Sequence, residues 1–421
     1  MFLLYNFFLT VLSPIWVPWM LWRTSRRDKK PNWKERTGDY SIERSKDERR
    51  IWVHAVSVGE VVAALPILKG IRELDPTLKI VLSVTTSSGH TTAEEKTPGL
   101  VDHLVYFPLD VARFQLAAMV RVDPKVVAIM ETELWMNFLW AAKSVDARTL
   151  LVNGRISDRS FPRARKLGFF YKSLFRFLDR ALMQTEQDAE RARTLGARSV
   201  EVMGNCKFDE ATSADEMESE TLRREFEIVE GSKVIVVGST RGADEEAMVI
   251  EAIRSIGLNH LIVIHAPRHL ERAQALGDAV RQAFGDVAYR SKKEAGKYVV
   301  LDTYGELGRV YALADVVVVG GGFGDYGGQN LIQPLALGKP VIHGPYMQNF
   351  KEAAGQALAA GATVVCSDAS ELASTLQGLL NGDEKRRSMS GAASSFVRSH
   401  LGAARRYAEA IVGEANASAI R

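Results

Sequence analysis

The sequence predicts an α/β protein with two domains, each built on a parallel sheet with helices on both faces. Short apolar segments alternate with helical patterns along most of the chain, which is the order of elements in a parallel sheet. An acidic, polar segment at residues 212–230 divides this alternation into two series of similar length. The length of 421 residues suffices for two or three domains of ordinary size.

The composition is that of an ordinary globular protein, with 25% charged residues. The formal net charge of only +3 argues against a general nucleic-acid binder. The two cysteines, Cys206 and Cys366, form no ligand cluster, and we expect both to be reduced in a cytosolic setting. His265 and His269 have the spacing of metal ligands on a helix, but Pro267 lies between them and no third ligand is near in the sequence. We therefore expect neither a bound metal nor a cofactor.

Residues 1–22 form an apolar segment without a charged side chain. About 20 apolar residues can span a bilayer, and Trp16, Trp19 and Trp22 cluster toward one end, as interfacial aromatic residues do. A basic flank follows, made of Arg23, Arg26, Arg27, Lys29 and Lys30. Such a flank stays in the cytoplasm, and no charge precedes the apolar run as in a signal peptide. We expect a membrane anchor that either spans the bilayer or, because Pro14 and Pro18 weaken a straight helix, lies on it.

The first domain is expected over residues 23–211. Its predicted strands are residues 51–56, 79–85, 103–107, 125–130, 149–153, 180–184 and 199–203. Residues 160–178 mix aromatic and basic side chains in a predicted helix. This composition suits a lipid surface, and it also suits a core helix with a charged outer face.

Glu60 lies in the first turn of the helix that follows the first strand. The helix dipole favours a carboxylate there and is expected to keep it ionised near neutral pH. Glu60 is therefore a candidate general base. The spacing Ser57-x-x-Glu60 is also that of a capping box, and spacing alone favours this structural role.

Two acids and two cations follow other strands of the same sheet. Glu131 and Glu133 come directly after the strand that ends at residue 130; they share a face if the strand continues and diverge if a helix has begun. Arg155 and Lys207 follow two further strands and are expected at the same edge, where cations hold an anionic donor or acceptor. The structural alternatives are charge at a helix start for the acids and a solvated surface for the cations.

The second domain is expected over residues 212–421, with a last helix that can pack back on the first domain. Its predicted strands begin at residues 233, 261, 298, 316, 340 and 361. The strand that begins at residue 261 is expected to carry His265, Arg268 and His269 past its end, with Arg268 as an anion clamp.

Residues 316–334 are the most distinctive part of the second domain. Four valines predict a buried parallel strand, a loop with six glycines follows, and a helix is expected over residues 330–337. Glycine lets backbone N–H groups approach a ligand closely, and a helix N-terminus favours phosphate. Ligands of open α/β sheets bind beyond the carboxyl ends of strands. The stretch therefore predicts a phosphate-binding loop, although its spacing is not the dinucleotide fingerprint and a plain flexible turn is the alternative.

Eight short motifs occur together in one order along the chain. They are Ser57-Val-Gly-Glu60, Met130-Glu-Thr-Glu-Leu-Trp135, Asn153-Gly-Arg-Ile-Ser157, Gly204-Asn-Cys-Lys-Phe-Asp209, His265-Ala-Pro-Arg-His269, Asp302-Thr-Tyr-Gly-Glu-Leu307, Gly327-Gly-Gln-Asn330 and Asn349-Phe-Lys351. With them the chain resembles, over essentially its whole length, the 3-deoxy-D-manno-octulosonic acid (Kdo) transferases of lipopolysaccharide biosynthesis. Two α/β domains joined by one linker also match the GT-B fold, in which two Rossmann-like domains face a cleft.

The resemblance implies an inverting, metal-independent glycosyltransferase that moves Kdo from CMP-Kdo to the lipid A precursor lipid IVA. Its partners would include an anionic membrane surface, at the cytoplasmic face of the inner membrane. Glu60 would be the general base, which reverses the preference for a cap, and Glu131 and Lys207 would stabilise the transition state. The CMP site would be lined by residues of three segments of the second domain, Pro267, Arg268, Gly305, Glu306, Leu307, Asn330, Leu331, Ile332 and Gln333.

Gln333 departs from the family pattern, which has a glutamate that accepts hydrogen bonds from the nucleotide ribose. An amide still accepts through its carbonyl oxygen but loses the charge-assisted bond. One alternative is therefore a GT-B transferase with another nucleotide-sugar donor. A second alternative is a non-catalytic, membrane-anchored nucleotide-binding protein, against which the joint presence of Glu60, Glu131, Lys207 and Arg268 counts.

Overall fold

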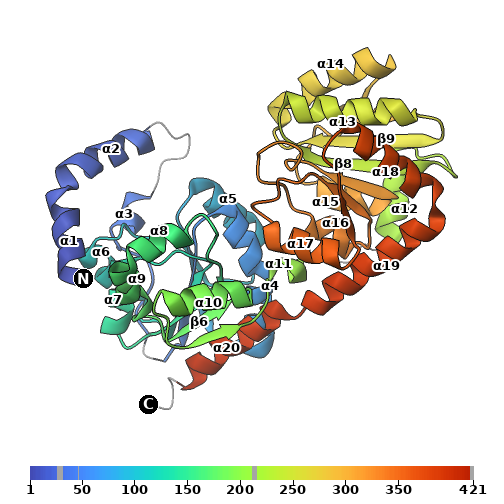
Figure 1. Cartoon of the computed structure of the whole chain (residues 1–421). Coiled ribbons are helices and arrows are strands. Elements are labelled where there is room, and N and C mark those ends of the chain that lie inside the picture. The colour runs from blue at the N-terminus through green and yellow to red at the C-terminus, as the bar shows by residue number, and fades with distance from the viewer. Residues whose placement is uncertain (26–31, 46, 211–215, 418–421) are drawn as a thin grey trace. The chain divides into compact units, whose positions relative to one another are not determined.

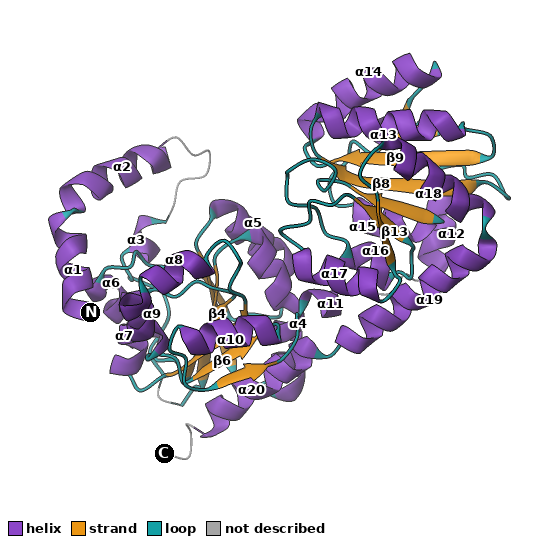
Figure 2. Ribbon diagram, in the orientation of Figure 1, coloured by secondary structure: helices purple, strands orange, loops and turns teal. Residues whose placement is uncertain are grey.

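The computed structural model describes residues 1–25, 32–45, 47–210 and 216–417 (Figure 1, Figure 2). The chain divides into two compact units: unit 1 comprises Met1–Glu210 with Leu401–Arg421, and unit 2 comprises Ala211–His400. The linker expected from residue 212 begins within residues 211–215, which lie outside the described residues. The last 21 residues of the chain are thus grouped with unit 1; the sequence assigned them to the second domain, with a last helix that can pack back on the first.

The sheet of unit 1 has seven parallel strands in the order β3-β2-β1-β4-β5-β6-β7. Their bounds are β1 (Arg50–Ala55), β2 (Lys79–Val84), β3 (His103–Tyr106), β4 (Val126–Met130), β5 (Arg148–Gly154), β6 (Arg180–Met183) and β7 (Val200–Val202). Each corresponds to a strand expected from the sequence. Trp52 lies in the core on one side of the sheet and Val53 in the core on the other. Burial on both faces explains why these strands are nearly continuous apolar runs.

Helices cover both faces of this sheet (Figure 2). They are α3 (Trp33–Arg36), α4 (Val58–Leu74), α5 (Ser87–Lys96), α6 (Ala112–Val122), α7 (Met136–Ser144), α8 (Phe161–Lys166), α9 (Gly168–Phe175), α10 (Glu186–Thr194), α11 (Lys207–Glu210) and α20 (Ala403–Ala417). The helices α4 and α20 pack closely, since a Cβ atom at Gly70 would lie 2.9 Å from the Cβ of Ala408. The single helix expected over residues 160–178 is wrong, because the chain breaks it at Leu167 into α8 and α9.

The N-terminal segment forms two helices, α1 (Phe2–Val11) and α2 (Ser13–Ser25), rather than one. Among the described residues no single helix is long and apolar enough to cross a membrane; Phe2–Val11 and Ser13–Met20 qualify only as a pair, bent by 67°. One side of α1 packs on unit 1: Phe2 stacks on Trp140 with ring centroids 4.6 Å apart. Of the basic flank, Arg26, Arg27, Lys29 and Lys30 lie outside the described residues.

The sheet of unit 2 also has seven parallel strands, in the order β10-β11-β9-β8-β12-β13-β14. Their bounds are β8 (Lys233–Thr240), β9 (Leu261–Pro267), β10 (Ala288–Tyr289), β11 (Tyr298–Val300), β12 (Val316–Val319), β13 (Val341–His343) and β14 (Thr363–Val365). The four valines of β12 are all fully buried at the centre of this sheet, as their run predicted. The short edge strand β10 was not expected from the sequence.

The helices of unit 2 are α12 (Glu216–Glu225), α13 (Ala243–Ile256), α14 (Ala273–Phe284), α15 (Leu307–Val310), α16 (Ile332–Ala336), α17 (Lys351–Ala359), α18 (Ala369–Asn381) and α19 (Asp383–His400), with the 3-10 turns η1 (Leu270–Arg272), η2 (Arg290–Lys292) and η3 (Tyr311–Leu313). The helix expected over residues 330–337 is thus shorter and begins at Ile332. His265 does not lie past the end of its strand: it is inside β9 and fully buried, bonded to Thr240 and Tyr298.

Candidate active site

Glu60 lies at the start of α4, next to the carboxyl end of β1. Its carboxylate accepts a hydrogen bond from the backbone N–H of Val56 at 2.8 Å, and the Ser57 hydroxyl donates to it at 3.3 Å. Ser57 is the N-cap residue of α4 but makes no side-chain bond to the helix backbone. The capping box suggested by the spacing is therefore wrong. The carboxylate instead secures the end of β1, and only 9% of the residue is exposed.

The pKa of Glu60 is raised from its ordinary value of 4.5 to about 7. Burial is the main cause; the bond from Val56 lowers the pKa, and the negative charges of Glu131 and Glu133 raise it further. The expectation that Glu60 is ionised near neutral pH therefore holds only in part, because burial raises its pKa to about 7. A carboxylate with a pKa near neutrality is well matched to proton abstraction, since it is both available as a base and basic enough to act.

Glu131 and Lys207 meet at the same edge of the sheet. The Nζ of Lys207 lies 3.1 Å from the Oε1 of Glu131, and each side chain is about one-fifth exposed. Glu131 directly follows β4 with a positive φ of 54°, and its N–H donates to the carbonyl of Val152 at 2.9 Å. Lys207 begins α11, where its N–H donates to the side chain of Asn205 at 3.0 Å. The left-handed backbone at Glu131 turns the chain sharply at the strand end, a strain typical of functional sites.

Glu133 and Arg155 complete this edge. Because β4 ends at Met130 and α7 begins only at Met136, Glu131 and Glu133 lie in a turn, neither on a strand face nor on a helix. Burial and the charge of Glu131 both raise the pKa of Glu133. The N–H of Arg155 donates to the carbonyl of Glu131 at 3.4 Å. The edge thus holds three neighbouring carboxylates and, on Lys207, an ammonium group that pairs with one of them.

In unit 2 the expected donor residues follow the carboxyl ends of β9 and β11. Pro267 is the buried last residue of β9, and Arg268 is exposed, with its N–H bonded to the carbonyl of Thr240 at 2.9 Å. Gly305 adopts a φ of 83° in the turn after β11, and Leu307 begins α15. Arg268 is thus an exposed cation that directly follows the carboxyl end of β9.

Glu306 lies in the same turn as Gly305, and its carboxylate is already engaged. It pairs with the guanidinium of Arg290 at 2.9 Å and accepts from the hydroxyl of Thr303. The bond from Arg290 is the main cause that lowers the pKa of Glu306. Arg290 also pairs with Glu225 in α12, so it links that helix to the turn.

The segment 330–333 leads into α16. The side-chain oxygen of Asn330 accepts from the N–H of Ile332 at 2.9 Å. The side chains of Leu331 and Ile332 are buried in the core, whereas Gln333 is half-buried. Gln333 lies near Gly308: a Cβ atom added at Gly308 would be 3.7 Å from the side-chain amide nitrogen of Gln333. Of this segment, Gln333 and Asn330 are the side chains able to meet a ligand.

The glycine loop after β12 is organised by an acid that the sequence did not single out. The carboxylate of Glu245, in the first turn of α13, accepts from the N–H groups of Gly321 (2.8 Å) and Phe323 (3.1 Å), and from that of Arg241. These two loop N–H groups are therefore not available to a phosphate, contrary to the simplest expectation for the loop. The sequence showed only a run of acids, Asp244 to Glu246, at a helix start.

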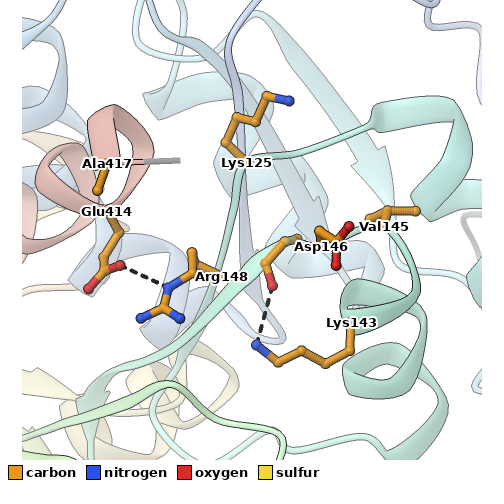
Figure 3. Close-up of a pocket in the computed structure, with 8 residues that line it drawn as sticks. Lys125, Lys143, Val145, Asp146, Arg148, Glu414 and Ala417 are labelled. Carbon is orange, nitrogen blue, oxygen red and sulfur yellow. Dashed lines mark hydrogen bonds and ion pairs between the residues drawn. The ribbon is translucent and has the colours of Figure 1, made fainter. Parts of the chain in front are cut away.

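One pocket in unit 1, of about 480 Å³, lies away from this chemistry (Figure 3). It is at the amino ends of β4 and β5, lined among others by Lys125, Lys143 and Arg148. Arg148 pairs with Glu414 at 2.9 Å, and Lys143 pairs with Asp179 and donates to the carbonyl of Ala147. Its cations are largely balanced by acids. Within the described parts of the chain, no group of three or more His, Cys, Asp or Glu side chains is arranged to hold a metal ion.

Residues 31–210 match the family model described as 3-deoxy-D-manno-octulosonic-acid transferase (kdotransferase). Over 375 residues the chain is 34% identical to the 3-deoxy-D-manno-octulosonic acid transferase of Bordetella pertussis, and the match covers 86% of each chain. The chain belongs to the Kdo transferase family. It is therefore a glycosyltransferase, as the eight motifs indicated.

Solved structures place the transferase in the GT-B fold. A UDP-N-acetylglucosamine 2-epimerase superposes with a TM-score of 0.63 at 16% identity, over 89% of this chain and 97% of that one. A glycosyltransferase from Rickettsia africae superposes with a TM-score of 0.59 at 12% identity, over 87% of this chain and 99% of that one. At these identities the likeness shows the fold alone, and it agrees with the two parallel seven-stranded sheets.

Proposed function

We propose that this transferase moves Kdo, with inversion and without a metal ion, from CMP-Kdo to the lipid A precursor lipid IVA. The donor sugar follows from the family. The observation that carries the mechanism is the buried carboxylate of Glu60, with a pKa of about 7, beside the Glu131–Lys207 pair.

In the proposed step Glu60 takes the proton of the acceptor hydroxyl. The hydroxyl oxygen forms a bond to the anomeric carbon of Kdo as the bond from that carbon to the phosphate oxygen of CMP breaks, and the electron pair leaves with CMP. The bond from the N–H of Val56 orients the carboxylate without requiring a proton from it. Burial keeps Glu60 basic, so the proton transfer occurs near neutral pH.

Lys207 and Glu131 stabilise the charge that develops in this step. The anomeric carbon becomes positive as the leaving group departs, and the carboxylate of Glu131 favours that charge. The ammonium of Lys207 favours the anionic groups of the donor, which carries both a carboxylate and a phosphate. The Nζ of Lys207 lies 3.1 Å from the carboxylate of Glu131, so the two charges are already side by side before the donor arrives.

The donor's CMP moiety is assigned to unit 2. Arg268 binds the phosphate as an exposed guanidinium past the end of β9. The turn from Gly305 to Leu307 and the segment from Asn330 to Gln333 hold the nucleoside. Gln333 gives up the charge of the family glutamate but retains a carbonyl oxygen for the ribose hydroxyls.

The N-terminal helices anchor the transferase to the cytoplasmic face of the inner membrane, where a lipid acceptor is available. Their exposed apolar side chains are Leu3, Leu4, Phe7, Phe8, Val11, Leu12, Ile15, Trp19 and Trp22. The opposite side of α1 is bonded to unit 1, through Tyr5 to Asp110 at 2.8 Å and through Asn6 to Asn137 at 2.7 Å. Because these polar bonds hold one side of α1 to the protein, we propose that α1 lies on the bilayer.

The test is a transfer assay with CMP-Kdo and tetraacylated lipid A precursor in the presence of EDTA, read by mass spectrometry. We expect a product heavier by one or more Kdo units. Absence of product from a protein that still binds CMP would contradict the proposed donor. In that case the same assay with Gln333→Glu distinguishes a weakened ribose contact, which the variant restores, from a different nucleotide sugar, which it does not.

A further inference from the structure

The short segment that carries Lys207 has little secondary structure of its own. It leaves β7 after Val202 and reaches only the four-residue helix α11. An ion pair between partly exposed groups such as Lys207 and Glu131 contributes little by itself, and a lysine side chain is long and flexible. The place of the ammonium therefore depends on what fixes the backbone of residues 203–209.

That backbone is held by α20, some two hundred residues later in the chain. The hydroxyl of Tyr407, which is fully buried, donates to the carbonyl of Gly204 at 2.7 Å and reaches the carbonyl of Met183 at 3.3 Å. The guanidinium of Arg406 donates twice to the carbonyl of Met203, at 2.8 and 3.1 Å. Gly204 has a φ of 89°, and a Cβ there would lie 3.3 Å from the Cβ of Ala403, so its backbone lies close against the helix.

The other end of the segment is joined to the start of the same helix. The carboxylate of Asp209 accepts from the N–H groups of Gly402 and Ala404, the latter at 2.8 Å. These N–H groups lie at the start of α20 and lack partners within the helix. Hydrogen bonds thus join residues 203–209 to α20 on both sides of Lys207.

Between these two anchors, Cys206 joins the segment to the helix that carries the base. Its N–H donates to the side chain of Asn153 at 3.2 Å, and its thiol donates to the carbonyl of Ala63 in α4 at 3.1 Å. Asn153 itself has a positive φ of 52° at the end of β5. The residue next to Lys207 is therefore fixed to α4, the helix that carries Glu60 in its first turn.

We propose that Tyr407 is a positioning residue for the transfer reaction, and that α20 holds Lys207 against Glu131. The inference rests on the proposed roles of those two residues. The C-terminal helix α20, which belongs to unit 1, would then have a function: it fixes the backbone of the segment around Lys207. A shift of the ammonium by about 1 Å is enough to slow a positioned reaction by roughly a hundredfold.

The test compares Tyr407→Phe with Tyr40→Phe in the full-length protein. Tyr40 is a matched control, because its buried hydroxyl also donates to a carbonyl in unit 1, that of Tyr106 at 2.9 Å, and not to the Lys207 segment. For Tyr407→Phe we expect kcat to fall by roughly ten- to a hundredfold, KM for CMP-Kdo to stay within about twofold, and amide exchange at Cys206 and Lys207 to rise. Tyr40→Phe should lower the melting temperature comparably without changing kcat.

A double-variant cycle separates positioning from general destabilisation. If Tyr407 acts through Lys207, Tyr407→Phe has little further effect on kcat in a Lys207→Ala background. Equal losses in both backgrounds, or an unchanged kcat in Tyr407→Phe, would overturn the inference. If instead amide exchange rises but Lys207→Ala itself turns over normally, the proposed role of Lys207 fails, and the inference fails with it for that separate reason.

Discussion

The ammonium of Lys207 lies 3.1 Å from the carboxylate of Glu131, whose own charge is one of the causes that raise the pKa of Glu60. The lysine therefore offsets part of the repulsion that Glu131 exerts on the proposed base. Removing the lysine charge leaves Glu131 uncompensated and should make Glu60 harder to ionise.

The pH dependence of kcat/KM tests this coupling. The wild-type acid limb should have its midpoint near the Glu60 pKa of about 7, because the base acts only when deprotonated. In Lys207→Met that midpoint should move to higher pH, and the maximal kcat/KM at high pH should also fall. Lys69→Met, an exposed lysine on the same helix as Glu60, is the control and should leave the limb in place. A Lys207→Met limb that coincides with the wild-type limb would refute the coupling.

The buried carboxylate of Glu60 should also make the folded protein less stable at high pH. Its pKa is about 7 in the folded protein and 4.5 ordinarily, so the folded state binds more protons between these values and loses stability as pH rises through them. Glu60→Gln lacks this loss. The variant should gain on the order of 3 kcal/mol at most over wild type at pH 8, and nothing at pH 4.5. Denaturant unfolding at the two pH values measures it, and an equal difference at both would argue against a buried, titrating carboxylate.

Arg268→Ala should weaken CMP binding by roughly ten- to a hundredfold, the value of one charge-assisted hydrogen bond. Arg281→Ala, on the exposed side of α14, is the control for the loss of one positive charge from unit 2. Titration calorimetry with CMP gives both affinities. If the two variants bind CMP equally well, the phosphate binds elsewhere.

Glu245→Gln should loosen the glycine loop. An amide replaces one acceptor oxygen by a donor, so at least one of the three N–H groups now bonded to Glu245 loses its partner inside the protein. We expect faster amide exchange at Gly321 and Phe323 and a weaker affinity for CMP. Asp244→Asn, the exposed neighbour in the same helical turn, should change neither. Unaltered exchange in Glu245→Gln would show that the loop is shaped by other contacts.

Membrane binding should depend on the exposed side of the N-terminal helices. Replacing Leu3, Phe7 and Ile15 by serine removes three exposed apolar side chains and should weaken binding to anionic phosphatidylglycerol vesicles at least about a hundredfold. A matched triple variant replaces Val229, Leu358 and Leu401, exposed apolar residues outside the N-terminal helices, by serine. It should bind the vesicles as the wild type does. Undiminished sedimentation of the first variant would point to another surface, such as the one around Phe169.

The strands and the residues at their ends follow from the sequence for a simple reason. Apolar runs such as Val316–Val319 are buried on both faces of the sheet. A short stretch of sequence is therefore enough to predict such a strand. The carboxyl ends of parallel strands share one edge, which is why Glu131 and Lys207, 76 positions apart in the sequence, meet there. Neither inference requires knowledge of long-range side-chain packing.

What the sequence could not supply depends on packing between distant segments. The raised pKa of Glu60 is caused mainly by burial, which no local sequence pattern reports, and so its rise to about 7 was not expected. Glu245 and Tyr407 were not singled out because the glycine-loop N–H groups that Glu245 accepts from, and the carbonyl that Tyr407 donates to, lie 76 or more residues away. Pro14 and Pro18 indicated that the N-terminal helix would not be straight, but the apolar composition continues through Leu12 and did not indicate that the helix breaks there.

The central claim, that Glu60 is the base for Kdo transfer, is tested most directly by single-turnover kinetics of Glu60→Gln. The rate of product formation from CMP-Kdo and lipid A precursor is measured at pH 8, with CMP affinity determined on the same preparation. We predict that the variant folds, binds CMP as wild type does, and transfers Kdo more slowly by about a hundredfold or more. A near-normal rate would contradict the account, because the wild-type carboxylate would then not be needed to take the proton.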